Sequence, residues 1–153
     1  MTRKNKHDYR IDYYKKSNGG TALIPIVVLE NQRYFSINPS AKVLLNYIAR
    51  QYNGYNNGDL CATLSLLKQF GFNSQDTLTR SIKQLEQNGL IERTRQGGKD
   101  WATGQNLPTL FALTWQPIDE CKGKLDIDST TKPAVDFINE WKKVPRPNIG
   151  RWI

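Results

Sequence analysis

The sequence contains a single histidine, His7, and lacks the common motifs that mark enzymes. A catalytic triad built on histidine and a metal site with several histidine ligands both need this residue inside a folded site. His7 lies instead in a polar, basic stretch, so both kinds of site are excluded. The phosphate-binding patterns GxGxxG and GxxxxGKS/T and the nucleophile pattern GxSxG are missing as well. A carboxylate-based or lysine-based enzyme stays open, but no motif indicates one, and we expect a protein without catalysis or cofactor.

Cysteines and long apolar runs are also scarce. Cys61 and Cys121 are 60 residues apart and neither belongs to a CxxC pair, which favours free thiols in a reducing cytoplasm. The longest apolar run, residues 22–29, is far shorter than the roughly 20 residues of a membrane-spanning helix. No apolar segment follows the first bases of the chain within 20 residues, so we expect neither a secretory signal nor a membrane partner.

Basic residues exceed acidic ones, with 22 Lys and Arg against 14 Asp and Glu and a net charge of +8 at pH 7. The excess is greatest at the start, where residues 1–20 hold six bases and two acids. We expect a flexible basic arm there. A basic chain attracts phosphate backbones, although the same charge can serve solubility alone.

Three helices are predicted in the middle of the chain. Asn38 before Pro39 is a typical N-cap followed by proline at the first helical position. One helical face then carries the apolar residues Ala41, Leu44, Leu45, Ile48 and Tyr52. A second helix is expected from Thr63 to Gly71. A third begins after Ser74, ends at Asn88–Gly89, and has an expected buried stripe of Leu78, Ile82 and Leu85.

Strands are predicted at 59–62, at 90–95 and at 110–115. In the last of these, Phe111, Leu113 and Trp115 alternate with Ala112 and Thr114. The simplest pairing joins 90–95 to 110–115 as a hairpin with a long basic tip. The segment Leu23–Leu29 fits either a short edge strand or a brief helix after Pro25.

This order of elements resembles the winged helix-turn-helix superfamily. The segment Thr63–Gly98 carries the resemblance, and its most specific part is SIKQLEQNGLIERTR, residues 81–95. That part is similar to the recognition helix and wing strand of many bacterial transcription regulators. The segments NPSAKVLLNYIARQYNG and FALTW are similar to small phage or mobile-element proteins, some of which are regulators and some of which help to start replication. Leu67 departs from the alanine that many such proteins have four residues before the turn glycine.

The resemblance implies a mainly α fold with a small β-hairpin wing, an α+β domain over residues 21–117. A linker and a helical tail follow over 118–153. It also implies which residues contact DNA. On the recognition helix they are Asn73, Ser74, Gln75, Asp76, Thr79, Arg80 and Lys83. On the wing they are Arg93, Arg95, Gln96 and Lys99.

The chemistry of these residues suits contacts with DNA, although some of them have other possible partners. Arg80 can fork onto a guanine edge and Gln75 can pair with an adenine, whereas Lys83 suits a phosphate. Asp76 and Arg80 are four residues apart and can instead pair with each other. Arg93 and Arg95 are two residues apart, so one sheet face is expected for both. Trp101 can stack on a base or sugar, but we expect it to pack back on its own hairpin.

The tail contains an apolar stripe of Ala134, Phe137, Ile138 and Trp141 on a helix that Pro133 can open. We expect this helix to dock on the segment Ile24–Leu29, on the helix around Leu44–Ile48, on a second copy of the chain or on another protein. Asp136 and Glu140 are expected to stay exposed and to repel phosphates.

The function predicted from the sequence is sequence-specific binding of double-stranded DNA, with transcription regulation as the role. The alternatives are replication initiation in a phage or plasmid-like element and a protein-interaction module without a DNA role. A DNA-binding protein should present its basic residues on one continuous face, formed by Arg80, Lys83, Arg93, Arg95 and Lys99.

Overall fold

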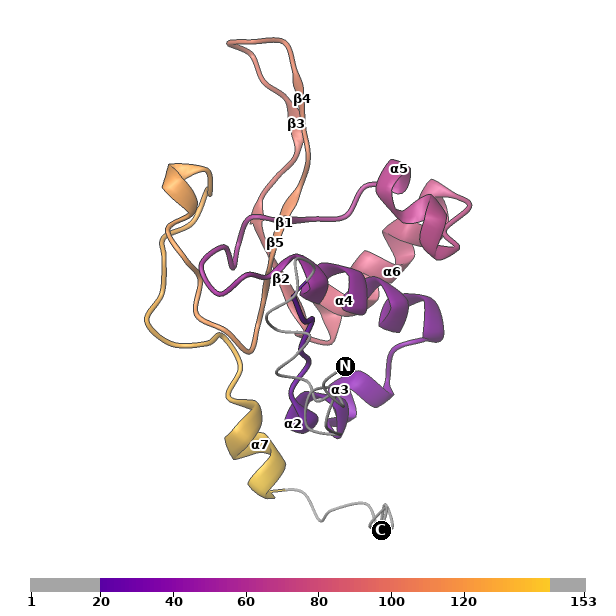
Figure 1. The fold of residues 1–153 in the computed structure, drawn as a ribbon, viewed down its shortest axis with the longest axis vertical. Coiled ribbons are helices and arrows are strands. Elements are labelled where there is room, and N and C mark those ends of the chain that lie inside the picture. The colour runs from indigo at the N-terminus through magenta and orange to yellow at the C-terminus, as the bar shows by residue number, and fades with distance from the viewer. Residues whose placement is uncertain (1–19, 144–153) are drawn as a thin grey trace, which may run out of the picture.

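The structure is a computed structural model that describes residues 20–143. The predicted basic arm, apart from its last residue, and the chain from residue 144 onward lie outside the described residues. The described part is an α+β fold in which most of the helices lie to one side of a small antiparallel sheet (Figure 1).

Helix α4 (Pro39–Gln51) begins where the sequence predicts. The Asn38 side chain accepts a hydrogen bond of 2.8 Å from the backbone N–H of Ala41, which caps the first turn. The predicted stripe is buried at its first four positions, and Tyr52, the C-cap, is half-buried. This face of α4 packs against α6 in the core of the protein.

The second predicted helix is a short turn, α5 (Leu64–Leu67), followed by a 3-10 turn over Lys68–Phe70. Helix α6 (Gln75–Gln87) begins after Ser74, whose hydroxyl accepts a hydrogen bond of 3.2 Å from the Thr77 N–H. Leu78 and Leu85 are buried as predicted, whereas Ile82 is only half-buried. Ser81 is buried beside them because its hydroxyl donates to the Thr77 carbonyl at 2.9 Å.

Three strands form the main sheet in the order β1 (Leu60–Cys61), β5 (Leu110–Leu113) and β2 (Ile91–Arg95). The predicted hairpin is confirmed, since β2 and β5 pair antiparallel with Ile91 opposite Leu113. Strand β1 pairs with the other edge of β5. The central strand therefore has a neighbour on each side.

The predicted alternation of buried and exposed residues in β5 is wrong, because residues 110–114 are all buried. One face of the sheet packs on the helices. On the other side the Thr94 hydroxyl donates to the Gly58 carbonyl at 2.6 Å, and the Asp126 N–H donates to the Thr94 carbonyl at 2.9 Å. The loop before β1 and the chain after residue 117 therefore cover the second face, which no local pattern in β5 reveals.

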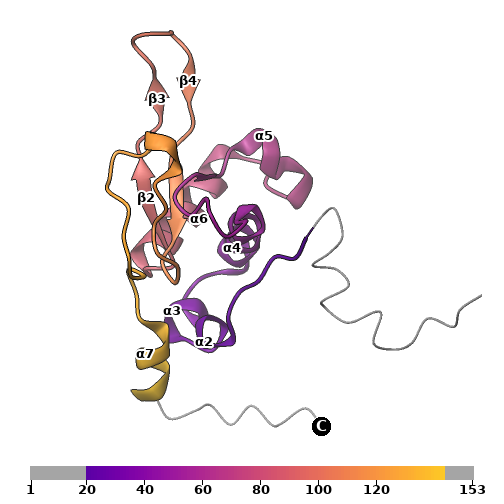
Figure 2. The same ribbon diagram turned by 60° about the vertical axis from the view of Figure 1, so that its left-hand side comes forward.

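The predicted loop between the paired strands contains a second, two-stranded ladder. Strands β3 (Gly98–Lys99) and β4 (Asn106–Leu107) pair antiparallel and extend the hairpin well beyond the sheet (Figures 1 and 2). At its base a Cβ on Gly97 would lie 2.5 Å from the Thr109 backbone nitrogen, so the two chains approach too closely there for any side chain.

The tail packs on the N-terminal helices α2 (Ile26–Leu29) and α3 (Gln32–Phe35). Of the two structures expected for Leu23–Leu29, the brief helix after Pro25 is the one formed. Helix α7 (Phe137–Lys143) contacts α2, and the Trp141 indole N–H donates to the Glu30 carboxylate at 2.9 Å. Docking on the segment Ile24–Leu29 is thus confirmed.

The predicted stripe of the tail is wrong at two positions. Helix α7 begins at Phe137, three residues later than Ala134, because the Val135 N–H donates to the Thr114 carbonyl and holds that stretch extended. Asp136 caps the helix by accepting from the Asn139 N–H at 3.0 Å. Phe137 is buried, whereas Ala134 and Ile138 are exposed.

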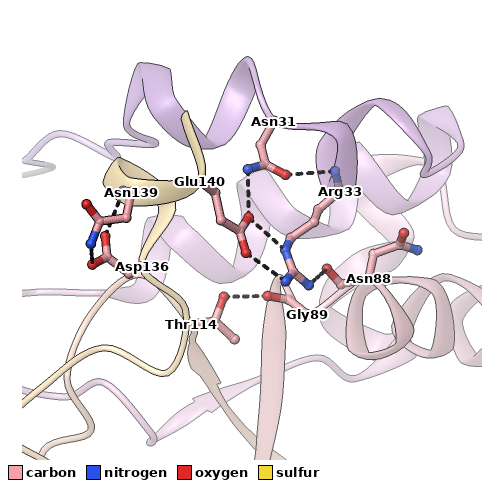
Figure 3. A network of polar contacts seen from close by, with 8 residues as sticks. All are labelled: Asn31, Arg33, Asn88, Gly89, Thr114, Asp136, Asn139 and Glu140. Carbon is pink, nitrogen blue, oxygen red and sulfur yellow. Dashed lines mark hydrogen bonds and ion pairs between the residues drawn. The ribbon is translucent and has the colours of Figure 1, made fainter. Parts of the chain in front are cut away.

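A polar network joins α7 to α3 and to the C-terminal end of α6 (Figure 3). Glu140 accepts hydrogen bonds from Arg33 and from the Asn31 amide, and Arg33 also donates to the Asn88 carbonyl at 3.1 Å. The prediction that Glu140 stays free to repel phosphates is therefore wrong. These hydrogen bonds, that from Arg33 first, lower the pKa of Glu140.

Candidate nucleic-acid interface

The outer face of α6 is polar and exposed along its N-terminal half. Each of the seven residues predicted for the recognition helix is exposed in the structure. They are Asn73, Ser74, Gln75, Asp76, Thr79, Arg80 and Lys83. The cap at Ser74 and the buried side of α6 fix their direction, because the helix is anchored by Leu78 and Leu85 on its opposite face.

Several of these residues contact one another. The Arg80 guanidinium donates to the Asp76 carboxylate at 2.6 Å, so the pair considered as an alternative to a DNA contact is present. Both side chains are more than two-thirds exposed, at 69% for Arg80 and 75% for Asp76. An exposed pair at this spacing contributes only about 0.2–0.5 kcal/mol. The Gln75 amide likewise donates to the Thr79 hydroxyl at 3.3 Å.

A groove of about 470 Å³ lies between α6 and the sheet. It brings together Gln75, Thr79 and Lys83 from the helix and Arg93 from β2. Its remaining lining comes from Ala62, Ile82, Glu86, Thr109 and Phe111. The structure thus gathers three of the predicted helix residues and one predicted wing residue around a single concave surface.

Glu86 is a residue of this groove that the sequence analysis missed. Arg93 donates to both of its carboxylate oxygens, at 3.0 and 3.2 Å, and lies over the Phe111 ring at 5.8 Å from its centroid. The two residues are seven apart and meet because the chain reverses sharply at Asn88–Gly89. The clue in the sequence is this helix stop, which places the end of α6 beside the start of β2.

The two wing arginines do not follow simple strand alternation. A bulge lies between Arg93 and Arg95, so the register pairs Arg93 with Phe111 and Arg95 with the adjacent Leu110. The expectation that they share one sheet face fails for this reason. Arg95 is half-buried and donates to the Pro108 carbonyl at 3.1 Å, and Gln96 accepts from Arg93 at 2.7 Å.

Among the five predicted basic residues of the site, the two lysines have the fewest intramolecular contacts. Within residues 20–143, neither Lys83 nor Lys99 forms a side-chain hydrogen bond or ion pair, and both are exposed. Lys99 belongs to β3 and lies on the projecting hairpin (Figure 2). The candidate interface therefore offers two unengaged ammonium groups, one on α6 and one on the hairpin.

Trp101 does not pack back on its hairpin, contrary to the prediction. Its side chain is 97% exposed at the end of the β3–β4 hairpin. The ladder there has only two strands, and the tip residues around Trp101 are themselves exposed. An indole at this position has no second layer of protein to cover it.

The thiols have the character of ordinary structural side chains. Cys61 and Cys121 are both free, and burial raises the pKa of each thiol, so both are protonated at neutral pH. Within residues 20–143, no group of three His, Cys, Asp or Glu side chains is placed to hold a metal ion. The same residues contain no helix with the length and apolar character to cross a membrane.

No protein-family model, curated protein or solved structure matches this chain.

Proposed function

We propose that this protein is a winged helix-turn-helix protein that binds a specific site on double-stranded DNA. Helix α6 is the recognition helix, and β2 with the β3–β4 hairpin forms the wing. One observation carries the proposal: the exposed face of α6 is uniformly polar, and three of its residues share a groove with Arg93 at the base of the hairpin.

The N-terminal half of α6 contacts the base edges, because this part of the recognition helix enters the major groove in this class of module. Arg80 contacts a guanine edge and Gln75 an adenine edge. Arg80 must first leave Asp76, which costs about 0.2–0.5 kcal/mol. A good bidentate base contact is worth about 1–3 kcal/mol of discrimination, so the exchange is favourable at the correct base.

Lys83 and Lys99 contact the DNA backbone and so position the protein on the duplex. Lys83 lies one helical turn beyond Thr79 and reaches a phosphate at the edge of the major groove. Lys99 lies four residues beyond Arg95, up to about 13 Å along an extended strand, and its long side chain adds to that reach. Half a helical turn of DNA is about 17 Å, so the Lys99 ammonium group can reach the backbone beside the adjacent minor groove.

Transcription regulation is the role we infer, because a protein that occupies one duplex site can block or guide other proteins there. Replication initiation is the second candidate. The observation that favours it is Trp101, whose exposed indole suits DNA that has begun to open.

Selection from random duplex DNA, with sequencing of the bound fraction, gives the site, and a salt titration then tests the mode of binding. With about five to seven phosphate contacts, the slope of log affinity against log salt is expected near −4 to −6. Lys83→Ala should make this slope less steep by about 1. Arg50→Ala removes the same charge from the exposed end of α4 and should leave the slope unchanged. A flat response, or no duplex binding at low salt, contradicts the proposal.

A further inference from the structure

Trp101 is the most exposed large apolar side chain in the described part of the chain, at 97%. Burying a tryptophan removes roughly 150–250 Å² of surface from water, and this residue leaves nearly all of that free energy unused. Within residues 96–109 the only other exposed large apolar side chain is Leu107, at 36%. Trp101 is thus an isolated aromatic side chain on a polar hairpin.

The turn that carries Trp101 is held by hydrogen bonds. The Asp100 N–H donates to the Gln105 carbonyl at 2.8 Å, and the Gly104 N–H donates to the Asp100 carbonyl at 2.7 Å. The Asp100 carboxylate accepts from the Ala102 N–H at 3.0 Å and from the Thr103 hydroxyl at 2.9 Å. The indole is therefore presented by a preorganised tip, and binding it orders little additional chain.

We propose that Trp101 stacks on an unpaired base, so that the protein prefers DNA in which a base beside its duplex site is unpaired. This inference rests on the proposed function. It adds to the same site an aromatic surface that binds the face of a base. Every base has a π-face on which an indole can stack, and stacking of this kind needs no particular sequence. In a closed duplex the base faces are covered by their neighbours, and uncovering them costs a few kcal/mol per step, so the indole stacks at the lowest cost where a base is already unpaired.

The surroundings of Trp101 favour a nucleic acid over a protein partner. Aromatic anchors of protein interfaces lie near the centre of a well-packed patch that excludes water. The exposed residues around Trp101 include Lys99, Gln105 and Asn106, which can contact phosphates and base edges. The neighbouring Asp100 is half-buried, and its carboxylate accepts hydrogen bonds from the Ala102 N–H and the Thr103 hydroxyl within the tip. The hairpin also rises from β2, whose Arg93 lines the groove beside α6, so it belongs to the same side of the proposed site.

An open base beside a recognised duplex site is the first product of strand opening. A protein that binds this state more tightly than the closed duplex shifts the equilibrium toward opening, by the ratio of the two affinities. Strand opening of this kind would serve replication initiation, and it needs no energy source beyond binding.

The test compares two versions of the selected site, a closed duplex and the same duplex with one unpaired base. The unpaired base is moved through the positions that flank the site, and 2-aminopurine at that base reports stacking by loss of fluorescence. The quantity measured is the ratio of the two affinities. For the natural protein we expect a ratio between about 5 and about 100 at the best position.

Trp101→Ala should bring this ratio close to 1 and abolish the fluorescence change, whereas Trp101→Phe should keep part of both. Leu107→Ala is the matched control, because it removes the other exposed apolar side chain of the hairpin and should keep the ratio. A natural protein without any preference for unpaired DNA overturns this inference alone. A Trp101→Ala variant that keeps the ratio also overturns it, whether or not the variant binds DNA more weakly. Trp101 would then contact either another protein or the DNA backbone. Failure to bind any duplex removes the proposed function as well.

Discussion

Arg33 and Glu140 lie 107 residues apart in the chain and form a two-point ion pair. The Arg33 Nε donates to Oε2 of Glu140 at 3.1 Å, and its Nη2 donates to Oε1 at 2.9 Å (Figure 3). The same guanidinium donates through Nη1 to the Asn88 carbonyl at the end of α6, where a positive charge is favoured by the helix dipole. One arginine thus ties the tail to the C-terminal end of the proposed recognition helix.

The first prediction concerns the pH dependence of this pair. The pKa of Glu140 is lowered in the folded protein, chiefly by the hydrogen bond from Arg33. Its stabilising effect is therefore present above the ordinary glutamate pKa of about 4.3 and is lost as the pH falls through the lower folded-state value. Glu140→Gln should reduce the free energy of unfolding at pH 7 by about 0.5–1 kcal/mol, a small effect because the pair is over a third exposed.

Urea unfolding at pH 7 and near pH 3 measures this effect. The difference between Glu140→Gln and the natural protein should shrink at the lower pH, because pH 3 lies below the pKa of about 4.3 that glutamate has in the unfolded chain and approaches the lowered folded-state pKa. A difference of the same size at both pH values would show that the loss arises from packing and not from charge.

The second prediction concerns the anchoring of the tail. Phe137 is 3% exposed and meets the Trp115 ring edge-on at 6.4 Å between centroids, whereas its neighbour Ile138 is 58% exposed. Phe137→Ala should cost about 3 kcal/mol, and Ile138→Ala less than about 0.5 kcal/mol. For a chain of this size, 3 kcal/mol corresponds to a fall in Tm of roughly 6–12 °C. Deletion of residues 130–153 should destabilise at least as much as Phe137→Ala.

Calorimetry of the three variants measures these shifts. DNA binding at low temperature should persist in each, because no residue of the tail belongs to the proposed interface. Equal Tm values for the natural protein and the deletion would mean that α7 contributes nothing to the fold.

The elements that could be predicted from the sequence are those with local signals. Helix boundaries are set locally at Asn38, Ser74 and Gly89 by the residues next to them. A short stretch of sequence is therefore enough to predict each boundary. The exposed polar face of α6 follows from the same periodicity. These signals place the seven helix residues of the candidate site correctly on the surface.

The features that escaped prediction depend on how segments are placed in space. The two buried faces of β5 arise from a loop about 50 residues earlier and a segment that follows the strand. The exposure of Trp101 depends on the β3–β4 ladder leaving the body of the protein. The Arg93–Glu86 pair depends on the angle at which β2 returns past α6. For β5 the deciding contacts come from segments outside the strand, so its own residues carry no sign of them. For the other two the residues involved are close in the chain, but the geometry that exposes or pairs them is not given by residue type alone.

The third prediction separates reading from positioning on α6. Arg80→Ala should cost about 1–3 kcal/mol on the preferred site and relax base preference at the position that it reads. Arg50→Ala removes an exposed arginine from α4 and is the charge-matched control. A competition assay in which Arg80→Ala weakens specific and random DNA equally would contradict a reading role for this residue.

Asp76→Asn should raise the affinity for DNA, whereas Arg80→Ala lowers it. It removes the partner of Arg80 and a negative charge from the proposed interface, so binding to duplex DNA of any sequence should tighten. The free energy of unfolding should fall slightly, because Asp76 lies in the first turn of α6, where the helix dipole favours a carboxylate. Weaker binding to random DNA after this change would show that Asp76 does not face the DNA backbone.

The last prediction concerns Asn57, a buried side chain that resembles an ordinary turn residue in the sequence. It is fully buried, and its amide nitrogen lies 2.9–3.1 Å from the carbonyl oxygens of Leu113, Gln116 and Pro117. Its side-chain oxygen accepts from the Leu113 N–H at 2.8 Å. Asn57 thereby fixes the end of the central strand against the loop before β1.

Asn57→Ala leaves these backbone groups without their partner, and each buried group that stays unsatisfied costs about 1–3 kcal/mol. We expect a loss of at least about 3 kcal/mol by denaturant unfolding at pH 7. Asn46→Ala is the control, since Asn46 is exposed on α4 and alanine is the better helix former there. Asn57→Asp should be more harmful at pH 7 than at pH 4, because the new carboxylate would face three carbonyl oxygens and could donate only when protonated. If Asn57→Ala stays within about 1 kcal/mol of the natural protein, water replaces the amide and the strand end is held by its apolar contacts alone.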